Sequence, residues 1–296
     1  MTKIIAGTNG KNLAKQLSEN LNIAQIEAFV ECFADGELRV QLAARVNKED
    51  VLIVQSTSKP VNDHLIEILL LVDAAKRSGA HRIIALMPYF GYSRQDHLSY
   101  TFGPISTHVV ATLIEAAGID HLITVDLHSQ RTEKFFKINV QNIETTTLFA
   151  PLLQDRPNLI IVSPDNGGII RARKLSELLG VNLAVISKFR KSHNTCQTEG
   201  LTGDVTGKHC IVIDDIVDTG ETLCKAAELL MQHGALSVEA MVTHAVLSKK
   251  ALANLEESEI KKVTITNTIE HTSLIDKLTV VDIGPLLTNI LRDLPE

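Results

Sequence analysis

Residues 210–222 read Cys-Ile-Val-Ile-Asp-Asp-Ile-Val-Asp-Thr-Gly-Glu-Thr, and this stretch decides the fold class. Its apolar run at 211–213 predicts a buried strand that ends at the adjacent carboxylates Asp214 and Asp215. Beyond the stretch, apolar residues recur at the spacing of one helical face: Leu223, Ala226, Ala227 and Leu230. The segment therefore predicts a strand, an acidic turn and a helix.

The groups in this turn suit a sugar phosphate. A helix that begins near Gly220 offers unpaired amides and a dipole that favours an anion, with the hydroxyls of Thr219 and Thr222 beside it. Asp214 and Asp215 can accept hydrogen bonds from sugar hydroxyls or bind a divalent ion. An acidic turn with a threonine capping the helix is the alternative interpretation. The pattern Asp-Asp-x-x-Asp-Thr-Gly-x-Thr after a β run is more specific than that, and it resembles the phosphoribosyl diphosphate (PRPP) motif of the type I phosphoribosyltransferase fold.

Strand patterns alternate with helical patterns along the whole chain, which favours a mainly parallel sheet with helices on both faces. The expected strands are 3–6, 51–55, 81–87, 122–126, 159–163, 182–189, 238–246, 263–268 and 278–282. The expected helices are 11–21, a helix capped by Asp63 and closed by Gly79, 106–117, one ending at Leu179, and one at the C-terminus. Residues 191–207 are polar and predict a long mobile loop.

The two halves of the chain share a short pattern at one fixed offset. Gly10, Ala14, Leu17, Ser18, Glu19 and Leu21 match Gly168, Ala172, Leu175, Ser176, Glu177 and Leu179. Together with the repeated order of elements, this match predicts a duplication. The boundary is expected near 144–157, where three threonines and two prolines interrupt the periodicity. We expect one domain at 1–145, joined by the C-terminal helix 284–296, and a second domain at 146–283.

Composition excludes several classes of protein. The 296 residues suffice for two domains of ordinary size, and 45% hydrophobic residues with 4% aromatics and no Trp suit an aliphatic α/β core. The net charge of −6 does not imply a basic face, so nucleic acid is not expected as the main partner. The longest apolar run, 65–72, contains Glu67 and cannot span a membrane. Four Cys without paired spacing predict free thiols in a reducing, cytoplasmic compartment.

Polar clusters follow several predicted strands, at 94–96, 126–129, 165, 188–190 and 214–222. In open α/β sheets, ligands bind where loops leave the carboxyl ends of the strands. A solvated loop is the better interpretation of His128 or Asp165 taken alone. Five clusters at strand ends are hard to explain in that way, so they predict one composite site.

Five segments in collinear order are similar to the ribose-phosphate pyrophosphokinase (PRPP synthetase) family. They are Gln-Ser-Thr-Ser-Lys-Pro-Val-Asn-Asp at 55–63, Pro-Tyr-Phe-Gly-Tyr-Ser-Arg-Gln-Asp at 88–96, Asp-Leu-His-Ser at 126–129, Val-Ser-Pro-Asp-Asn-Gly-Gly at 162–168, and the acidic turn. The resemblance implies two tandem type I phosphoribosyltransferase-like domains. It also implies the family's reaction, in which ATP and ribose 5-phosphate give PRPP and AMP with Mg²⁺.

The resemblance also implies roles for individual residues. The implied ATP-binding residues are Phe33, Asp35, Gly36, Glu37, Arg94 and Gln95. Those for ribose 5-phosphate are Arg190, Asp214, Asp215, Asp218, Thr219, Gly220, Glu221 and Thr222. Lys188 and Arg190 match the catalytic pair, and His128 and Asp165 the ligands of Mg²⁺. The Phe33 to Glu37 loop reaches a neighbouring subunit's site in that family, which implies a homo-oligomer of at least two chains.

Three departures from the family concern its regulatory site. Residues 97–103 contain no Lys or Arg, although the phosphate-activated class has several basic residues there. Asn47 stands where that class has a regulatory Arg, and the chain ends at Leu-Pro-Glu without the usual Ser-x-Ser tail. We therefore expect phosphate activation and allosteric ADP inhibition to be weak or absent. The same changes cast doubt on the hexamer typical of the regulated class.

Three other functions remain open, of which a binding module without chemistry is the least favoured. The first is a catalytically silent regulatory homologue that binds a true synthetase, against which Lys188, Arg190, His128 and Asp165 all speak. The second is a phosphoribosyltransferase that consumes PRPP, which leaves the matches at 33–37 and 94–96 unexplained. Product analysis with ATP, ribose 5-phosphate and Mg²⁺ separates the synthetase from the silent homologue, whereas a transferase would release pyrophosphate from PRPP with a nucleobase.

Overall fold

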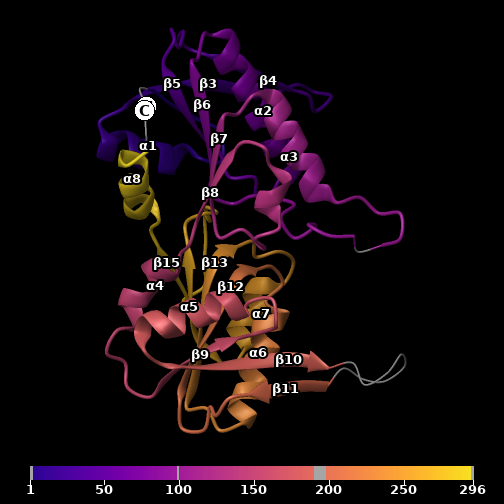
Figure 1. Cartoon of the computed structure of the whole chain (residues 1–296), viewed down its shortest axis with the longest axis vertical. Helices are drawn as coiled ribbons and strands as arrows, with labels where there is room; N and C mark the ends of the chain where they lie inside the picture. Colours follow the sequence, from indigo (N-terminus) through magenta and orange to yellow (C-terminus); the bar gives the residue numbers. More distant parts are fainter. Residues whose placement is uncertain (1–2, 99, 190–197, 295–296) are drawn as a thin grey trace. The chain divides into compact units, whose positions relative to one another are not determined.

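The computed structural model describes residues 3–98, 100–189 and 198–294. The chain divides into two compact units: unit 1 comprises Met1–Ile143, Thr268–Glu270 and Ile283–Glu296, and unit 2 comprises Glu144–Asn267 and His271–Asp282. Sequence patterns had placed this division between 145 and 146, with 284–296 assigned to the first half. Each unit is built on its own sheet (Figure 1).

Unit 1 contains a parallel sheet of order β2-β1-β5-β6-β7-β8. Its strands are β1 (Lys3–Ala6), β2 (Ala24–Ile26), β5 (Asp50–Val54), β6 (Arg82–Met87), β7 (His121–Val125) and β8 (Asn139–Ile143). A hairpin of β3 (Ala28–Cys32) and β4 (Leu38–Leu42) forms a separate two-stranded sheet. The helical elements are α1 (Lys11–Leu21), α2 (Val61–Arg77), α3 (Ser106–Ala117), η1 (Thr132–Phe135) and α8 (Gly284–Arg292). Helix α8 bonds to α1 through Asn20, whose Nδ2 donates to Thr288 Oγ1 (3.1 Å) and whose carbonyl accepts from Arg292 (3.0 Å).

Unit 2 contains a sheet of order β11-β10-β9-β12-β13-β14-β15, in which only the pairing of β11 with β10 is antiparallel. Its strands are β9 (Leu159–Ser163), β10 (Asn182–Phe189), β11 (Thr198–Thr202), β12 (His209–Val217), β13 (Ser237–Ala245), β14 (Ile260–Thr266) and β15 (Leu278–Val281). Its helices are α4 (Thr146–Leu153), α5 (Ile169–Leu179), α6 (Glu221–Gln232) and α7 (Ala251–Glu257).

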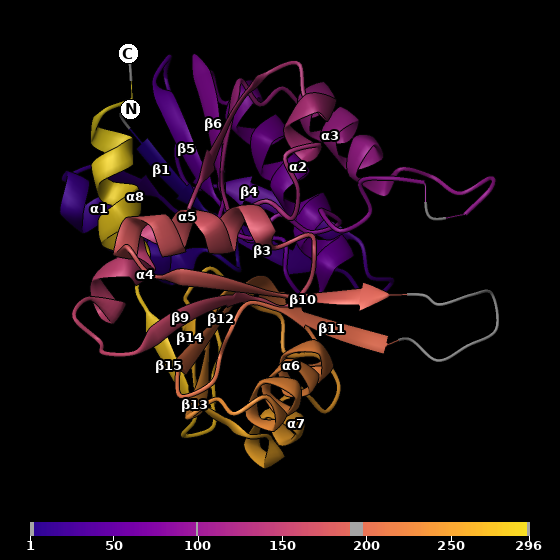
Figure 2. The ribbon, with the colours of Figure 1, turned by 60° about the horizontal axis from the view of Figure 1, so that its bottom comes forward.

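Alternation along the strands of unit 2 separates two cores. Ile161, Ile211 and Ile213 pack with residues of α4 and α5, whereas Ile160 and Val212 pack with residues of α6 and α7. Successive side chains on a strand point to opposite faces, so helices are required on both sides of the sheet. Figure 2 shows α5 on one side of this sheet, with α6 and α7 on the other.

The two sheets repeat one strand order. Reading across unit 1 gives β2-β1-β5-β6-β7-β8, and the corresponding run in unit 2 is β10-β9-β12-β13-β14-β15. Helices α1 and α5 hold equivalent places after β1 and β9, and both bury the residues of the shared pattern, Ala14 and Leu17 in one and Ala172 and Leu175 in the other. By this correspondence, the turn from β5 to α2 is the unit 1 counterpart of the acidic turn from β12 to α6.

Several predicted elements match the structure, including α1, α3, β9 and β10, while other strand ends differ by one to three residues. The predicted cap at Asp63 is wrong, because α2 begins at Val61 after Pro60 and places Asp63 in its first turn. There the carboxylate favours the positive end of the helix dipole. The predicted end of the strand at Asp214 is also wrong, because β12 continues to Val217.

The predicted loop at 191–207 is wrong for Thr198–Thr202, which forms β11 and pairs with β10 through the backbone. The rest of that prediction lies partly outside the described residues. Elements that the sequence patterns missed are β2, β3, β8, η1, α4 and α7. Cys32, Cys210 and Cys224 are free thiols, and no helix within the described ranges is both long and apolar enough to cross a membrane.

Candidate active site

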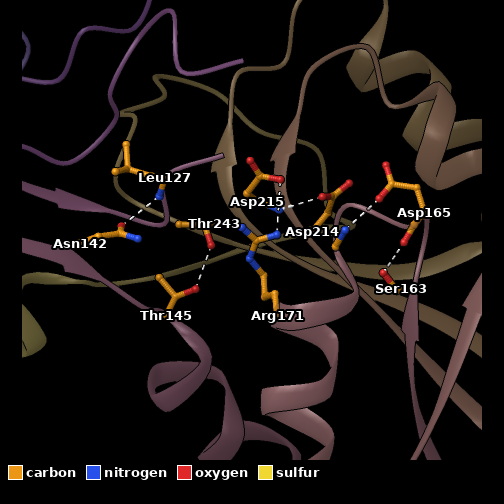
Figure 3. A network of polar contacts seen from close by, with 10 residues as sticks. Leu127, Asn142, Thr145, Ser163, Asp165, Arg171, Asp214, Asp215 and Thr243 are labelled. Carbon is orange, nitrogen blue, oxygen red and sulfur yellow. Dashed lines mark hydrogen bonds and ion pairs between the residues drawn. The ribbon is translucent and has the colours of Figure 1, made fainter. Parts of the chain in front are cut away.

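Two adjacent carboxylates on β12 form the centre of the polar network in unit 2. Asp215 is 4% exposed and Asp214 is half-buried. The Asp215 backbone N–H donates to Asp214 Oδ1 (2.9 Å), and Arg171 Nη1 of α5 lies 3.4 Å from Asp215 Oδ1. Figure 3 shows the Arg171 side chain rising from α5 toward both carboxylates. One guanidinium therefore faces two carboxyl groups in a largely buried place.

This crowding changes the ionisation of Asp214. Burial raises its pKa well above the ordinary value, and the neighbouring Asp215 and Asp165 raise it further. Arg171 acts in the opposite direction without cancelling these effects. Because desolvation and like charges both disfavour the ionised form, added positive charge here would stabilise the carboxylate.

Asp165 follows β9 in the same unit. Its Oδ1 accepts a hydrogen bond from the Gly168 N–H (2.9 Å) at the start of α5, and Ser163 Oγ donates to its backbone carbonyl (2.7 Å). A Cβ added at Gly168 would lie 2.9 Å from Ser163 Oγ, so a larger residue would disturb this turn. The carboxylate of Asp165 is thus fixed at a helix N-terminus.

Residues 218–222, hereafter the phosphate turn after the role that the sequence predicts, run from the end of β12 into the first turn of α6. Gly220 is the N-cap of α6 with φ of 79°, a left-handed conformation that favours glycine. The first amides of α6 have no carbonyl partner within the helix, so they are available to an anion. Ser248 N donates to Asp218 O (2.9 Å), its hydroxyl donates to the Asp218 carboxylate, and Asn254 Nδ2 donates to Thr219 O (2.8 Å).

In unit 1, Arg94 and Gln95 are exposed on the loop after β6. Gln95 is fixed by three hydrogen bonds: its N–H donates to Tyr92 O (2.9 Å), its carbonyl accepts from Thr107 N (3.2 Å), and its Oε1 accepts from Ser106 Oγ (2.7 Å). The last two donors begin α3. The loop is therefore held at the N-terminus of that helix.

Asp96 connects this loop to the loop after β7. It is 6% exposed and accepts hydrogen bonds from the Ser129 hydroxyl and from His97 Nδ1 (2.7 Å). Burial acts to raise the pKa of Asp96, but these two hydrogen bonds and the nearby His128 outweigh it, so the pKa is lowered. His128 is exposed, and the backbone beside it is fixed where Leu127 N donates to Asn142 Oδ1 (3.0 Å; Figure 3).

The Phe33 to Glu37 segment is the tip of the β3–β4 hairpin. The Phe33 N–H donates to Glu37 O (2.8 Å), and the Gly36 N–H donates to Phe33 O (2.9 Å). Phe33 is 48% exposed, and Arg39 lies over its ring at 5.8 Å. Gly36 has φ of 94°. The tip is therefore a closed turn that presents an aromatic ring and two carboxylates to its surroundings.

In the unit 1 counterpart of the phosphate turn, the side-chain hydroxyls form hydrogen bonds within the unit. Ser56, Thr57 and Ser58 are buried, and their hydroxyls are engaged with Thr268 O (2.5 Å), Tyr89 O (3.1 Å) and Asn9 Nδ2 (2.6 Å). Glu67 accepts hydrogen bonds from the N–H and hydroxyl of Thr8, both at 2.6 Å. The three hydroxyls of this turn are therefore engaged within unit 1.

The structure thus brings together some of the predicted residues and not others. Asp165, Asp214, Asp215 and the phosphate turn lie in unit 2, while Arg94, Gln95, His128 and the hairpin tip lie in unit 1. The proposed metal pair is divided between the units, and within the described ranges no cluster of three His, Cys, Asp or Glu could hold a metal ion by itself. Lys188 belongs to β10, and Arg190 lies outside the described residues.

Three residues of the network escaped the sequence interpretation: Arg171, Ser248 and Asn254. Arg171 lies three residues after Gly168, the end of the fourth motif, so its place on the first turn of α5 is the one signal that could have indicated it. The other two act across long sequence separations. Ser129 belongs to the predicted cluster 126–129, but its bond to Asp96 was not predicted.

Comparison with known proteins identifies the family. The profile of the N-terminal domain of ribose phosphate pyrophosphokinase matches residues 2–118, and that of the phosphoribosyl transferase domain matches residues 138–274. A ribose-phosphate pyrophosphokinase of Agrobacterium fabrum is 44% identical over 274 residues, covering 92% of this chain and 88% of the relative. The chain belongs to the ribose-phosphate pyrophosphokinase family.

Other ribose-phosphate pyrophosphokinases agree with this assignment. Ribose-phosphate pyrophosphokinase 1 of Streptococcus pneumoniae is 41% identical over 293 residues, covering 96% of this chain and 91% of the relative. The crystal structure of phosphoribosylpyrophosphate synthetase from Mycobacterium smegmatis superposes with a TM-score of 0.92 at 35% identity, covering 99% of this chain and 98% of that one. The predicted fold and enzyme class are therefore confirmed: this is a ribose-phosphate diphosphokinase, an enzyme that produces PRPP.

Proposed function

We propose that this enzyme transfers the β,γ-diphosphoryl group of ATP to the anomeric hydroxyl of ribose 5-phosphate, with Mg²⁺ as the metal. A bond forms between the anomeric oxygen and the β-phosphorus while the β-phosphorus loses its bond to the bridging oxygen of AMP. The electrons of that bond leave with AMP, and the hydroxyl proton is released. The products are PRPP and AMP.

The observation that supports this reaction most is the continuity of β12 with the phosphate turn. Asp214 and Asp215 lie on the strand that leads directly into Asp218–Thr222, so carboxylates and unpaired helix amides share one end of one element. We assign the hydroxyls of ribose to the two carboxylates. The 5-phosphate is assigned to the turn, where Thr219, Gly220, Glu221 and Thr222 offer amides and two hydroxyls to the anion.

We assign ATP to unit 1. Arg94 and Gln95 are exposed, and the fixed loop that carries them continues into Asp96 and its bond to Ser129. We assign the exposed hairpin tip, with Phe33, Asp35, Gly36 and Glu37, to the adenine of the ATP that a neighbouring chain binds. This assignment makes the enzyme a homo-oligomer of at least two chains. Gel filtration combined with light scattering tests the oligomeric state directly.

The residues present fit Mg²⁺. This ion prefers oxygen ligands, keeps several waters and often binds through one or two protein groups plus substrate phosphates. The raised pKa of Asp214, caused by burial and by neighbouring carboxylates, indicates a surplus of negative charge beside Asp165. We assign Asp165 and His128 to the metal. When bound, Mg²⁺ would neutralise phosphate charge and orient the diphosphoryl group.

Lys188 and Arg190 are assigned as the catalytic cations. Phosphoryl-type transfer depends on positioning and on neutralising charge, so cations on the transferred group contribute more than a strong base does. Lys188 lies near the end of β10, whose backbone pairs with β11, and Arg190 is assigned to ribose 5-phosphate as well. Loss of either cation is expected to lower turnover by about 10³-fold, by analogy with an arginine finger.

The test is product identity. The purified protein is incubated with ATP, ribose 5-phosphate and Mg²⁺, and AMP and PRPP are followed by chromatography. Stoichiometric AMP and PRPP support the proposal. ADP as the product would contradict diphosphoryl transfer, and no turnover would favour a silent homologue. Release of pyrophosphate from PRPP with a nucleobase would favour a phosphoribosyltransferase.

A further inference from the structure

The carbonyl groups of the phosphate turn are held by a distant part of unit 2. Ser248 N donates to Asp218 O (2.9 Å), and the Ser248 hydroxyl donates to the Asp218 carboxylate. Asn254 Nδ2 on α7 donates to Thr219 O (2.8 Å). Two successive carbonyls of the turn are thus engaged by donors that lie 30 and 35 residues further along the chain.

The orientation of these carbonyls decides whether the turn can bind an anion. A phosphate is held by N–H groups, and a peptide carbonyl turned toward it would present the negative end of its dipole. The peptide bond between Thr219 and Gly220 is the one that could rotate its carbonyl toward the anion, since Gly220 at φ of 79° has the backbone freedom to reorient. The bond from Asn254 fixes the carbonyl of that peptide on the side of α7, which leaves the Gly220 N–H directed away from the Asn254 side chain.

Asn254 is itself held in a fixed place. The next residue, Leu255, is fully buried and packs against Gly220, since a Cβ added there would lie 3.3 Å from Leu255 Cγ. Lys277 Nζ donates to three carbonyls at the end of α7: Leu255 O (3.1 Å), Glu256 O (2.7 Å) and Ser258 O (2.8 Å). A cation at a helix C-terminus is favourable to the dipole. The helix can therefore hold its donor in register with the turn.

We propose that Asn254 is a positioning residue for ribose 5-phosphate, acting through the Thr219 carbonyl to keep the phosphate turn in its anion-binding form. This inference rests on the assignment of the 5-phosphate to residues 218–222. Its effect is specific to one substrate, because ATP is assigned to residues of unit 1. Loss of the bond should weaken ribose 5-phosphate binding about 3- to 10-fold, the range expected for one neutral hydrogen bond.

Two variants test the bond. Asn254→Leu removes the donor at similar size, and Asn254→Asp keeps the shape but places a second acceptor against Thr219 O. The matched control is Gln232→Ala, which removes an exposed side-chain amide at the far end of α6. Full-length proteins are compared by steady-state kinetics with each substrate varied in turn, by calorimetric titration with ribose 5-phosphate, and by thermal unfolding.

The expected result is a 3- to 10-fold rise in KM and Kd for ribose 5-phosphate in Asn254→Leu, with a larger rise in Asn254→Asp. The KM for ATP and kcat should change less than about twofold in these variants, since nothing in unit 1 is altered. All three quantities should change less than about twofold in the control Gln232→Ala. An unchanged KM for ribose 5-phosphate in a folded variant, or an equal rise for both substrates, would overturn the inference. If the unaltered enzyme binds no ribose 5-phosphate, the assigned function fails instead.

Discussion

The Ser129 hydroxyl donates a hydrogen bond to the carboxylate of Asp96. This contact joins the loop after β6, which carries Arg94 and Gln95, to the loop after β7, which carries His128. Two segments assigned to ATP and its metal are therefore connected through one buried carboxylate. Asp96 also accepts a hydrogen bond from His97, and its pKa is lowered. The carboxylate therefore stays ionised in the folded enzyme at a pH below the ordinary pKa of an aspartate.

Ser129→Ala tests this connection. The change removes one donor from a buried carboxylate, so the loop with Arg94 and Gln95 should become less fixed. A hydrogen bond to a charged group contributes about 1.5–3 kcal/mol. We expect the KM for ATP to rise about 10-fold or more, with the KM for ribose 5-phosphate unchanged. Initial rates with each substrate varied measure both, and a rise confined to ribose 5-phosphate would refute the assignment of this loop to ATP.

Asp214→Asn separates stability from activity. The raised pKa of Asp214, due first to burial and then to Asp215, means that the folded protein binds this proton more tightly than the unfolded chain. Stability of the ligand-free protein therefore falls as pH rises from the ordinary aspartate range toward the folded pKa. The variant cannot ionise, so its Tm should exceed that of the unaltered protein at neutral pH and lose this dependence. Its kcat/KM for ribose 5-phosphate should fall about 10- to 100-fold, since charged hydrogen bonds are lost.

Thermal scans across pH, combined with kinetics, give both readouts for Asp214→Asn. A lower Tm at neutral pH together with retained activity would contradict both the burial argument and the assignment of the ribose hydroxyls to this carboxylate. Asp204→Asn is a suitable control, because Asp204 is exposed and its carboxylate accepts a local hydrogen bond from the Thr206 N–H (2.9 Å).

Gly220→Ala tests the conformation of the phosphate turn. Alanine at φ of 79° is strained, and its Cβ would approach Leu255 to 3.3 Å. We expect a loss of about 1 kcal/mol or more in unfolding free energy, together with a higher KM for ribose 5-phosphate. Gly180→Ala is the matched control, because Gly180 has φ of 65° at the end of α5 with no atom within 4 Å of an added Cβ. Equal effects of the two changes on KM would argue against a role for the turn in binding.

The elements that could be predicted from the sequence are those with a regular apolar pattern and with contacts between residues close together in the chain. Helices α1 and α3 were predicted to the residue because their apolar faces recur without interruption. Strand β11 was missed because Thr198–Thr202 is mostly polar and sits at a sheet edge, where its backbone pairs with β10 and no apolar pattern is required. The extension of β12 past Asp214 was missed because paired carboxylates rarely occur inside a buried strand unless a cation such as Arg171 faces them.

In the candidate site, too, local sequence patterns could be interpreted and contacts between distant segments could not. Asp214, Asp215 and the phosphate turn were predicted from a contiguous pattern whose chemistry is local. Ser248 and Asn254 could not be found in that way, because their bonds to the turn depend on the packing of α7 against α6 and on nothing in their own sequence context. The roles of Lys188 and Arg190 remain predictions based on the family resemblance.

Inorganic phosphate should not activate the enzyme. An activating anion site requires cations, yet residues 97–103 contain no Lys or Arg, and Leu98, Tyr100 and Phe102 are 63%, 81% and 104% exposed there. With ribose 5-phosphate saturating, initial rates measured over a phosphate series should show no steep rise, and ADP should inhibit only in competition with ATP. Sigmoidal inhibition by ADP, or a strong rate increase with phosphate, would show that the regulatory site is retained.

His121 should make the protein sensitive to mild acid. The side chain is 3% exposed on β7, and neither ring nitrogen has a hydrogen-bond partner among the described residues. Burial lowers its pKa, and the charge of Arg82 lowers it further, so the imidazole stays neutral in the folded state after the unfolded chain has bound a proton. Above the pKa of about 6.5 that His121 has in the unfolded chain, its ionisation does not affect the free energy of unfolding. As the pH falls below that value toward the folded pKa, the unfolded chain binds the proton first and the folded protein loses stability. Urea unfolding at a series of pH values should therefore give a shallower acid loss for His121→Leu than for the unaltered protein, with the two curves parallel above neutrality. Parallel curves through the acid range would show that the folded protein protonates His121 as readily as the unfolded chain does.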